Sequence, residues 1–549
     1  MPGPLSLTRS RTLGLVTLIT ALAIVGDVMV PGVARALGGF YVTTTEAKLH
    51  NDRAVVVLMR DGTRTVVSMQ NTYAGPAQDF ALIVPVPVVL KESDVKTLPR
   101  EVFDRLDGLT APRLVETWEQ DPCKPVGDTP PADPGLPPRD SDDGEPARAG
   151  GETATGGVTL EAQFTTGEYS VVILGAKQAA GLEAWLRDNG YKLPAGAAEA
   201  LRPYVDQGTK FLVARVDSSK LTVDERGHAT LSPLRFHYDS DSFDLPVRIG
   251  LVNSAGTQDL VIHIVARSRY VAANVPNATI PSNLEVKDTT RGSFAPFYVA
   301  LLDATLAQNP GAAITEYAWQ ANSCDPCPQP PLGFAELLTL GADVLPGIGG
   351  SLDKLGRGAE WKIPAEFVLT RLHVRPGKHS PGEDLVFKEA GPITGGREGA
   401  PLVPGAQPTS ELNSFQARYI IRHPWAGRIE CKEPHRGLWG EPPPGWTEGG
   451  STAPMVASDL AFVPRDASLA GYVAQDIPEI EFTVRLDAGT GAQTPAPMPR
   501  APSAPDVEIV LPGQPVASTR TSCGCASGEA PAGLLVLGIA GLALRRRRR

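Results

Sequence analysis

The chain has 549 residues, 20% of them charged, and a formal net charge of −10. An N-terminal segment and a C-terminal tail are basic, with net charges of +2 and +4, so the residues between them carry −16. This balance argues against a nucleic-acid partner, because phosphates would be repelled and no basic patch offsets the charge. About 490 residues between the two ends suffice for two or three domains.

The N-terminus has the pattern of a secretory signal peptide. Arginines precede an apolar run at residues 13–25, and Ala34-Arg35-Ala36 places small residues at the two positions that a signal peptidase recognises. An uncleaved membrane anchor is the alternative. The short apolar run and the Ala-x-Ala site favour removal of residues 1–36, with cleavage after Ala36.

The predicted ectodomain begins with a β-rich part, residues 37–123. Its first clear feature is a hairpin, because β-branched and apolar runs at 54–58 and 64–69 flank Asp61-Gly62. An Asp-Gly pair supplies the positive φ angles that a tight hairpin turn requires. The sequence therefore predicts two antiparallel strands joined through this turn.

An extended segment and a helix follow. Residues 80–90 are rich in valine, but Pro85 and Pro87 fall on the same side and remove two donors from one edge, which predicts an edge strand. Thr97 is the expected N-cap of the helix. The apolar residues at helical spacing are Val102, Leu106 and Leu109.

Residues 124–158 differ sharply in composition from their surroundings. They contain 14 Pro or Gly among 35 residues, no aromatic residue, and clustered acids at Asp140, Asp142 and Asp143. Such a segment cannot bury enough apolar surface to fold, which predicts a disordered linker or insertion.

The remainder of the ectodomain, residues 159–487, mixes strands and helices without regular alternation. A second hairpin is expected from 245–252 and 259–266, closed by residues 253–256. Further strands are expected at 169–174, 211–216, 365–374 and 415–421, and helices at 182–186, 199–205 and 333–345. The predicted class is α+β, with mixed or antiparallel sheets, hairpins, a few packed helices and many loops.

The C-terminus consists of a predicted stalk and a tail. Residues 488–522 begin with a stretch rich in Ala, Pro, Gly and Thr, the composition of a stalk. The tail, residues 523–549, has Cys523-Gly524-Cys525, an uncharged run at 531–544 and five final arginines. As a helix, 14 residues reach only ~21 Å against a hydrocarbon core of ~30 Å, so a span needs extra residues or snorkelling arginines.

The order of these three tail features resembles the sorting tail of myxobacterial surface proteins called MYXO-CTERM. The resemblance implies processing near Cys523 or Cys525 and retention at the cell surface. A plain tail-anchor helix is the alternative.

Four cysteines lie in the predicted ectodomain: Cys123, Cys324, Cys327 and Cys431. An even number suits disulfides in an oxidising exterior, and three pairings are open. The Cys324-Asp325-Pro326-Cys327 motif also allows redox chemistry or half of a zinc site. Structural disulfides are favoured, because further zinc ligands at matching spacing and the strand–motif–helix context of redox sites are both missing.

No motif predicts a catalytic residue, a metal site or a cofactor. The eight histidines are scattered, and a nucleophile elbow and a phosphate loop are missing. Asp239, Asp241 and Asp244 hint at a calcium loop, but its glycine and glutamate are absent, so a solvated turn is the default. The aromatic and cationic residues of 418–425, with Trp439 and Trp446, suit ligand stacking or, more simply, packing of a loop-rich part.

Several segments resemble the family known as domain of unknown function 2330. They are Gly38–Val42, Val57–Thr63, Asp79–Val88, Trp185-Leu186 with Gly190-Tyr191, and Leu231–Asp239. The resemblance runs from about Gly38 to at least Val374 and implies export but no established activity, so no catalytic residue is carried over. Members often have a cysteine beside the Gly-Phe motif, whereas Leu37 and Val42 stand there in this chain, so no disulfide is expected at that place.

The sequence therefore favours an exported, non-enzymatic protein with a structural, adhesive or binding role. Its expected partners are the membrane, through the tail, and a sorting machinery, and its protein or glycan ligand is not identified. The alternative is an envelope thiol–disulfide enzyme, or another enzyme whose site is assembled from distant residues. A pocket that gathered His237, Asp239, Arg418 and His423 would favour the latter.

Overall fold

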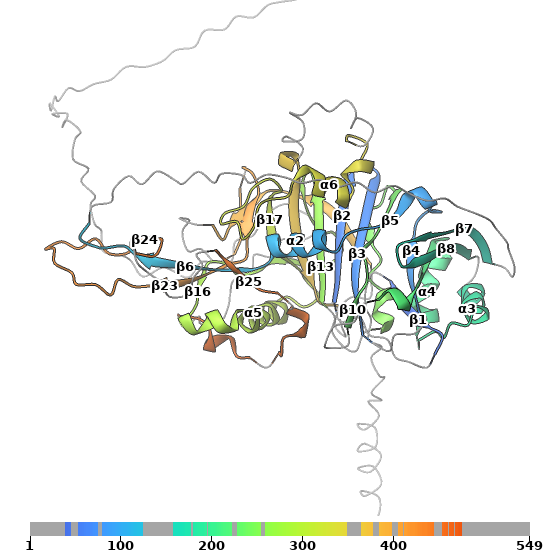
Figure 1. The fold of residues 1–549 in the computed structure, drawn as a ribbon, viewed down its shortest axis with the longest axis horizontal. Helices are drawn as coiled ribbons and strands as arrows, with labels where there is room; N and C mark the ends of the chain where they lie inside the picture. The colour runs from blue at the N-terminus through green and yellow to red at the C-terminus, as the bar shows by residue number, and fades with distance from the viewer. Residues whose placement is uncertain are drawn as a thin grey trace, which may run out of the picture. The chain divides into compact units, whose positions relative to one another are not determined.

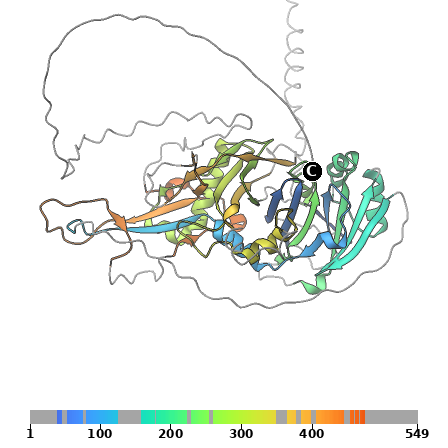
Figure 2. The same cartoon turned by 90° about the horizontal axis from the view of Figure 1, so that it is seen from above.

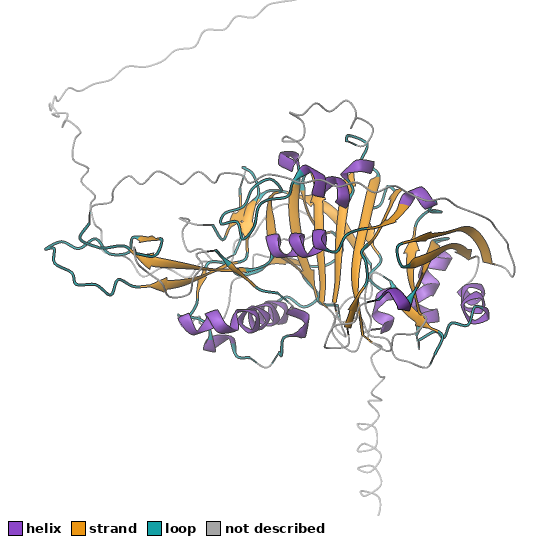
Figure 3. Cartoon of the chain, in the orientation of Figure 1, coloured by secondary structure: helices purple, strands orange, loops and turns teal. Residues whose placement is uncertain are grey.

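The computed structural model divides into two compact units, Met1–Ala496 and Pro497–Arg549. It describes residues 39–45, 53–74, 80–124, 158–176, 179–194, 196–221, 228–253, 259–348, 364–376, 384–397, 405–409, 411–443, 453–458, 460–465 and 467–474, all in the first unit. The predicted signal, the bulk of the linker, the stalk and the tail lie outside these residues. Within the described part, strands in four sheets and a few helices confirm the α+β class (Figures 1 and 3).

A twelve-stranded mixed sheet forms the centre of the fold (Figure 1). Its main path is β21 (Gln407–Pro408), β20 (Ile393–Gly395), β22 (Ser414–Gln416), β17 (Ala313–Gln320), β18 (Val368–Val374), β13 (Asp259–Ala266), β2 (Arg53–Asp61), β3 (Arg64–Ala74), β11 (Leu234–Asp239) and β5 (Val95–Thr97). Two short strands, β10 (His228–Thr230) and β15 (Asn277–Thr279), pair with β3 and β17. The predicted hairpin is β2–β3, whose turn contains Gly62 with a φ of 58°.

A five-stranded sheet packs on one face of the central sheet. Its order is β1 (Phe40–Thr43), β4 (Phe80–Val86), β9 (Lys210–Val216), β8 (Tyr169–Ala176) and β7 (Val158–Thr166). One core cluster joins the two sheets, with Leu82 and Ile173 on one side and Val56 and Ile262 on the other. Figure 2 shows this sheet beside the central one. Its other face is covered by the predicted helices α3 (Ala179–Asp188) and α4 (Ala197–Asp206).

The opposite face of the central sheet is covered by other helices. Residues of α2 (Glu101–Thr110) and α6 (Phe334–Leu340) share a core cluster with the buried residues of β2, β13 and β18 that face these helices. The longest helix, α5 (Phe294–Gln308), shares a separate cluster with β17, β22 and β23 (Arg418–His423). The observed helix α6 is shorter than the helix predicted at 333–345, because Gly341, at a φ of 141°, separates α6 from the 3-10 turn Ala342–Val344.

Two smaller sheets complete the described part. One has the order β12 (Asp244–Leu245), β19 (Leu385–Ala390) and β14 (Arg269–Ala272). The other has the order β16 (Leu284–Glu285), β23, β6 (Arg113–Glu119) and β24 (Trp439–Gly440), with β25 (Met455–Val456) also paired to β6. The strand predicted at 415–421 is thus two strands, β22 and β23, in different sheets.

Three local predictions were wrong. β4 is an inner strand between β1 and β9; β1 pairs only with residues 80–83, so Pro85 lies past the end of that shorter neighbour. The second hairpin does not form, because β13 is buried along its whole length and pairs with β2 and β18, while Pro246 follows the two-residue strand β12. Thr97 is not an N-cap: it pairs with β11 as the end of β5, and α2 begins after Arg100.

Candidate functional site

The side chains suggested by the sequence as a possible joint site are not gathered together. His237 lies on β11 at 3.6 Å from Asp94, and Asp239 at the end of β11 pairs with Arg64 at 2.7 Å. Arg418 and His423 lie on β23, in a different sheet. His423 pairs with a carboxylate of its own sheet at 2.8 Å, so the four residues do not form one pocket.

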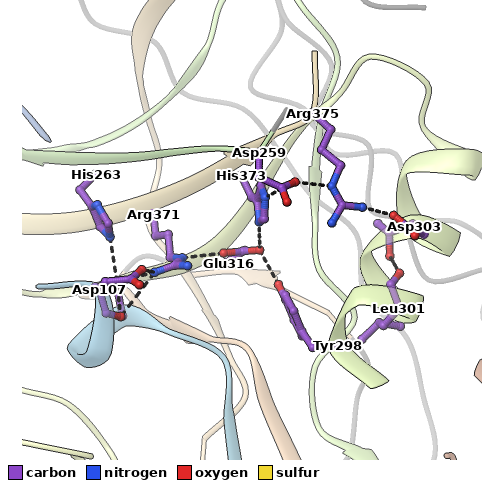
Figure 4. Close-up of polar contacts among 12 residues, drawn as sticks. Asp107, Asp259, His263, Tyr298, Leu301, Asp303, Glu316, Arg371, His373 and Arg375 are labelled. Atoms are coloured by element: carbon purple, nitrogen blue, oxygen red, sulfur yellow. Dashed lines mark hydrogen bonds and ion pairs between the residues drawn. The ribbon is translucent and has the colours of Figure 1, made fainter. Parts of the chain in front are cut away.

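A different set of ionisable residues is concentrated inside the fold, on the face of the central sheet that α2 covers (Figure 4). His263 on β13 and Arg371 and His373 on β18 alternate with core residues such as Leu372, which point to the opposite face. Side chains two residues apart in a strand share a face, so one strand supplies two cations to the same surface. All three side chains are almost fully buried.

A β-bulge places a carboxylate between these cations. In β17 the register with β18 shifts between Thr315 and Tyr317, so Glu316 is an extra residue opposite Arg371. An extra residue re-aims its side chain relative to the regular alternation. Glu316 is completely buried, accepts hydrogen bonds from Arg371 Nε at 2.6 Å and Tyr298 Oη at 2.5 Å, and lies 2.8 Å from Nδ1 of His373 (Figure 4).

The network extends from Arg371 to helix α2. Asp107 accepts a hydrogen bond from Arg371 Nη1 and another from Arg53 Nη2 at 2.6 Å. Thr110 donates to the Leu106 carbonyl at 2.9 Å, and its hydroxyl oxygen lies 2.9 Å from His263 Nε2. Thr110 donates its hydroxyl proton to the Leu106 carbonyl, so its oxygen can only accept a hydrogen bond from His263. Nε2 of His263 therefore carries a proton.

At its other end the network reaches helix α5. Nε2 of His373 is 3.2 Å from Asp259, so both ring nitrogens face carboxylates. Asp259 also pairs with Arg375 and, at 3.3 Å, with Arg465. Arg375 in turn pairs with Asp303 on α5. The network therefore connects α2, four central strands (β2, β13, β17 and β18) and α5.

The two histidines have opposite charge states. Burial alone would lower the pKa of His373, but Glu316 and Asp259 outweigh it and raise the pKa to about 9, so this ring is an imidazolium at neutral pH. Burial and the positive charge of Arg371 lower the pKa of His263 to about 3, so that ring is neutral. One histidine thus supplies a charge and the other only a hydrogen bond.

The carboxylates of the network are held ionised. Burial would raise the pKa of Glu316, but His373 and Arg371 outweigh it and lower the pKa to about 2. The pKa of Asp107 is also depressed, because Arg371 and Arg53 outweigh its burial. Asp259 is depressed in the same way by its hydrogen bond and charge interaction with His373 and by Arg375.

This arrangement matches structural cross-linking better than catalysis. Every carboxylate of the network has a cationic partner, and both nitrogens of His373 are engaged. A general acid or base must reach a proton of a substrate, whereas the central groups of the network, Glu316, His373 and Asp259, are buried. No cysteine or lysine contributes a hydrogen bond or ion pair to the network as the described residues form it, and no set of residues among them has metal-ligand geometry.

A smaller cluster lies on the sheet formed by β6 and β23. Glu116 accepts from Arg291 Nε at 2.8 Å and lies 2.8 Å from His423 Nε2, and the His423 ring stacks on Trp118 with centroids 4.8 Å apart. Among the predicted aromatic residues, Trp439 lies under Arg422, 4.8 Å from the ring centroid to the guanidinium carbon. The charged and aromatic groups of this cluster contact one another. This agrees with the interpretation that the aromatic and cationic residues pack a loop-rich part of the fold. Trp446 lies outside the described residues.

The four predicted disulfide cysteines form two pairs that differ greatly in sequence separation. Cys123 bonds to Cys431 across 308 residues, and Cys324 bonds to Cys327 across 3. In the chain-entropy model the long link stabilises the fold by about 6 kcal/mol and the short one by about 2 kcal/mol. The pairing therefore fits the prediction of structural disulfides for Cys123–Cys431 and leaves the short pair with a minor stabilising role. Cys523 and Cys525 lie outside the described residues.

Sequence reasoning did not identify the buried network, although a signal was present. Glu316, Arg371 and His373 are ionisable residues inside strands whose other residues are mostly apolar or small. A buried charge needs a partner, so charged residues at inward positions of different strands predict one another. Their pairing could not be read from the sequence because it depends on the order of strands and on the bulge.

Within the described residues there is no helix long and apolar enough to cross a membrane. Comparison with curated proteins and with solved structures finds no match. Comparison with protein families gives one whose sequence pattern fits residues 32–388, about two thirds of the chain. This range includes the Gly38–Val42 and Leu231–Asp239 segments that carried the resemblance. The chain therefore belongs to the family described as uncharacterized protein conserved in bacteria (DUF2330).

Proposed function

We propose that this chain is an exported protein held at the cell envelope, where its folded part has a structural or binding role and not an enzymatic one. Two sequence patterns support export and retention: the signal at residues 1–36 and the tail at residues 523–549. The buried network supports a structural role, because its charges neutralise one another and hold helices to the sheet.

The observation that carries the proposal is the Cys123–Cys431 disulfide. It joins the segment that follows β6 to the loop that follows β23, and the two cysteines are 308 residues apart in the sequence. Such links persist in oxidising compartments and are rare where thiols are kept reduced. The other two described cysteines are also paired, which further supports the proposed location outside the cytoplasm.

We propose that a partner binds the loop that contains Cys431 of this disulfide. Residues 424–438 are mostly exposed and include Ile429, whose apolar side chain is 42% exposed. The buried Glu119 holds the loop, because it accepts from the backbone N–H of Trp425 at 3.0 Å and of Gly437 at 2.8 Å. A braced, exposed loop presents a fixed surface to a binding partner at low entropic cost.

The test is fractionation of cells that produce the chain, with a matched variant that lacks residues 523–549. We expect the full chain in the envelope fraction and digested by protease added to intact cells, and the shortened chain released into the medium. Full-length chain in the cytosolic fraction, protected from external protease, would overturn the proposal. Release of both forms would refute anchoring by the tail and leave export standing.

A further inference from the structure

The loop between β17 and α6 carries a disulfide at the protein surface. Cys327 is exposed, whereas Cys324 is half-buried and packs against the core cluster beneath α2 and α6. A thiolate from outside can therefore reach one sulfur of the pair more easily than the other, and access is one of the factors that set the rate of disulfide exchange.

Hydrogen bonds to the backbone of this loop hold its shape in addition to the disulfide. Arg113 Nη1 donates to the carbonyl of Pro326 at 2.7 Å, and the amide of Gln416 donates to the carbonyl of Asp325. Farther along, Arg105 Nη2 donates to the carbonyls of Pro330 and Pro331 at 2.8 and 2.9 Å. The two sulfurs would therefore remain neighbours after reduction, which a reversible dithiol requires.

One buried cation, Arg113, contacts the backbone between the two cysteines. Arg113 is completely buried and donates only to backbone carbonyls, and it has no ion pair among the described residues. Burial lowers the pKa of Arg113 to about 10, so its guanidinium is still charged at neutral pH. A nearby positive charge favours a thiolate over a thiol. Asp325, between the two cysteines, acts in the opposite direction.

We propose that Cys324–Cys327 is an exchangeable disulfide that accepts two electrons from a protein dithiol in the envelope. One thiolate of the dithiol attacks Cys327 Sγ, the Cys324–Cys327 bond breaks, and Cys324 leaves as a thiolate that takes up a proton. The second thiolate of the dithiol then attacks its own partner sulfur in the mixed disulfide, which releases Cys327. The dithiol becomes a disulfide, and Cys324 and Cys327 become two thiols.

This exchange consumes one disulfide per dithiol and is not a catalytic turnover, so it adds to the proposed structural or binding role, and it does not depend on the tail. Its first test uses the purified mature protein, reduced thioredoxin as the protein dithiol, and maleimide labelling of each cysteine read by mass spectrometry. We expect Cys324 and Cys327 to be labelled at a dithiol concentration roughly tenfold or more below that needed for Cys123 and Cys431, with an unchanged circular dichroism spectrum. Labelling of both pairs together, or only after unfolding, would overturn the proposal.

Two single variants test which of the two sulfurs is more accessible to a reactant from outside. Cys324→Ser leaves Cys327 as a free thiol, and Cys327→Ser leaves Cys324. With a pyridyl disulfide as the probe, we expect the Cys324→Ser protein to react roughly tenfold faster, because Cys327 is the exposed sulfur. Equal rates, or faster reaction of Cys324, would contradict the assignment of Cys327.

A third variant tests the electrostatic argument without disturbing the core. The Asp325 side chain is part-exposed, and Asp325→Asn in the Cys324→Ser background removes the negative charge beside the reacting thiol. The reaction of Cys327 at pH 7 should become about twofold or more faster, because its thiolate is favoured. An unchanged or slower reaction would refute the electrostatic part of the proposal.

Discussion

Glu316 and Arg371 meet across the bulge between β17 and β18, with Arg371 Nε 2.6 Å from Glu316 Oε2 and both side chains almost fully buried. The bulge adds one residue to β17, and that residue is the carboxylate on which the rest of the network converges. Tyr298 of α5 donates to the same side chain. A single irregularity in the sheet thus creates the junction through which the helix is held.

Loss of the charge at this junction should destabilise the whole unit. Glu316→Gln keeps the shape of the side chain but removes one of the two carboxylates that Arg371 and His373 each face, so we expect the free energy of unfolding to fall by about 3–5 kcal/mol. Urea denaturation measures this. Glu366→Gln is the matched control, because Glu366 pairs with Arg267 at the surface and its loss should cost less than about 1 kcal/mol. Similar losses of unfolding free energy in the two variants would contradict a central stabilising role of the buried Glu316 carboxylate.

The pKa of His373 predicts a loss of stability at alkaline pH. Its folded value of about 9 lies above the ordinary 6.5, so its contribution is complete below pH 6.5 and is lost as pH rises through 9. The lost contribution is roughly 3 kcal/mol. Urea midpoints between pH 6 and 10 should therefore fall more steeply for the wild-type chain than for His373→Gln. Parallel profiles would show that this histidine is not charged in the fold.

His263 predicts the opposite dependence and serves as the matched comparison. Its folded pKa of about 3 lies below the ordinary value of 6.5, so between these pH values His263 is protonated in the unfolded chain and neutral in the folded chain. The stability of the fold therefore falls as pH decreases from 6.5 towards 3. His263→Gln should flatten this acid side of the profile and leave the alkaline side intact. A variant that altered only the alkaline side would reverse the two assignments.

The Gly-Gly-Phe segment near the predicted mature N-terminus has a structural explanation. Gly39 has a φ of 149°, and a Cβ there would lie 2.9 Å from the carbonyl oxygen of Ile83 on the neighbouring strand β4. Gly39→Ala should therefore cost about 1–3 kcal/mol in unfolding free energy. Gly391→Ala, where a Cβ meets nothing within 4 Å, is the control in the same thermal unfolding assay. Equal effects would show that the close approach does not constrain residue 39.

Local patterns predicted individual elements well. The Asp-Gly turn specified the β2–β3 hairpin, and apolar spacing specified α2, α3 and α4, because turn chemistry and helical periodicity act between near neighbours in the chain. Residue Thr97 shows the limit of such reasoning. Its hydroxyl and position suit an N-cap, but pairing with β11 makes it the end of a strand.

Long-range arrangement could not be predicted in the same way. β13 pairs in parallel with β2, about 200 residues earlier, and its burial on both faces removes the alternation that marks a half-exposed strand. The network residues Asp107, Glu316 and His373 come from three distant segments. Their ionisable character was visible, but their partners follow from strand order and from the bulge at Glu316.

The most direct test of the proposed function is mass spectrometry of the mature protein recovered from fractions of producing cells. We predict an envelope-bound chain that begins at Leu37, has Cys123 and Cys431 linked, and ends near Cys523 or Cys525. An intact Arg549 in the envelope fraction would replace processing by a simple anchor helix. A chain that begins at Met1 in the cytosolic fraction, with Cys123 and Cys431 as free thiols, would contradict the central claim.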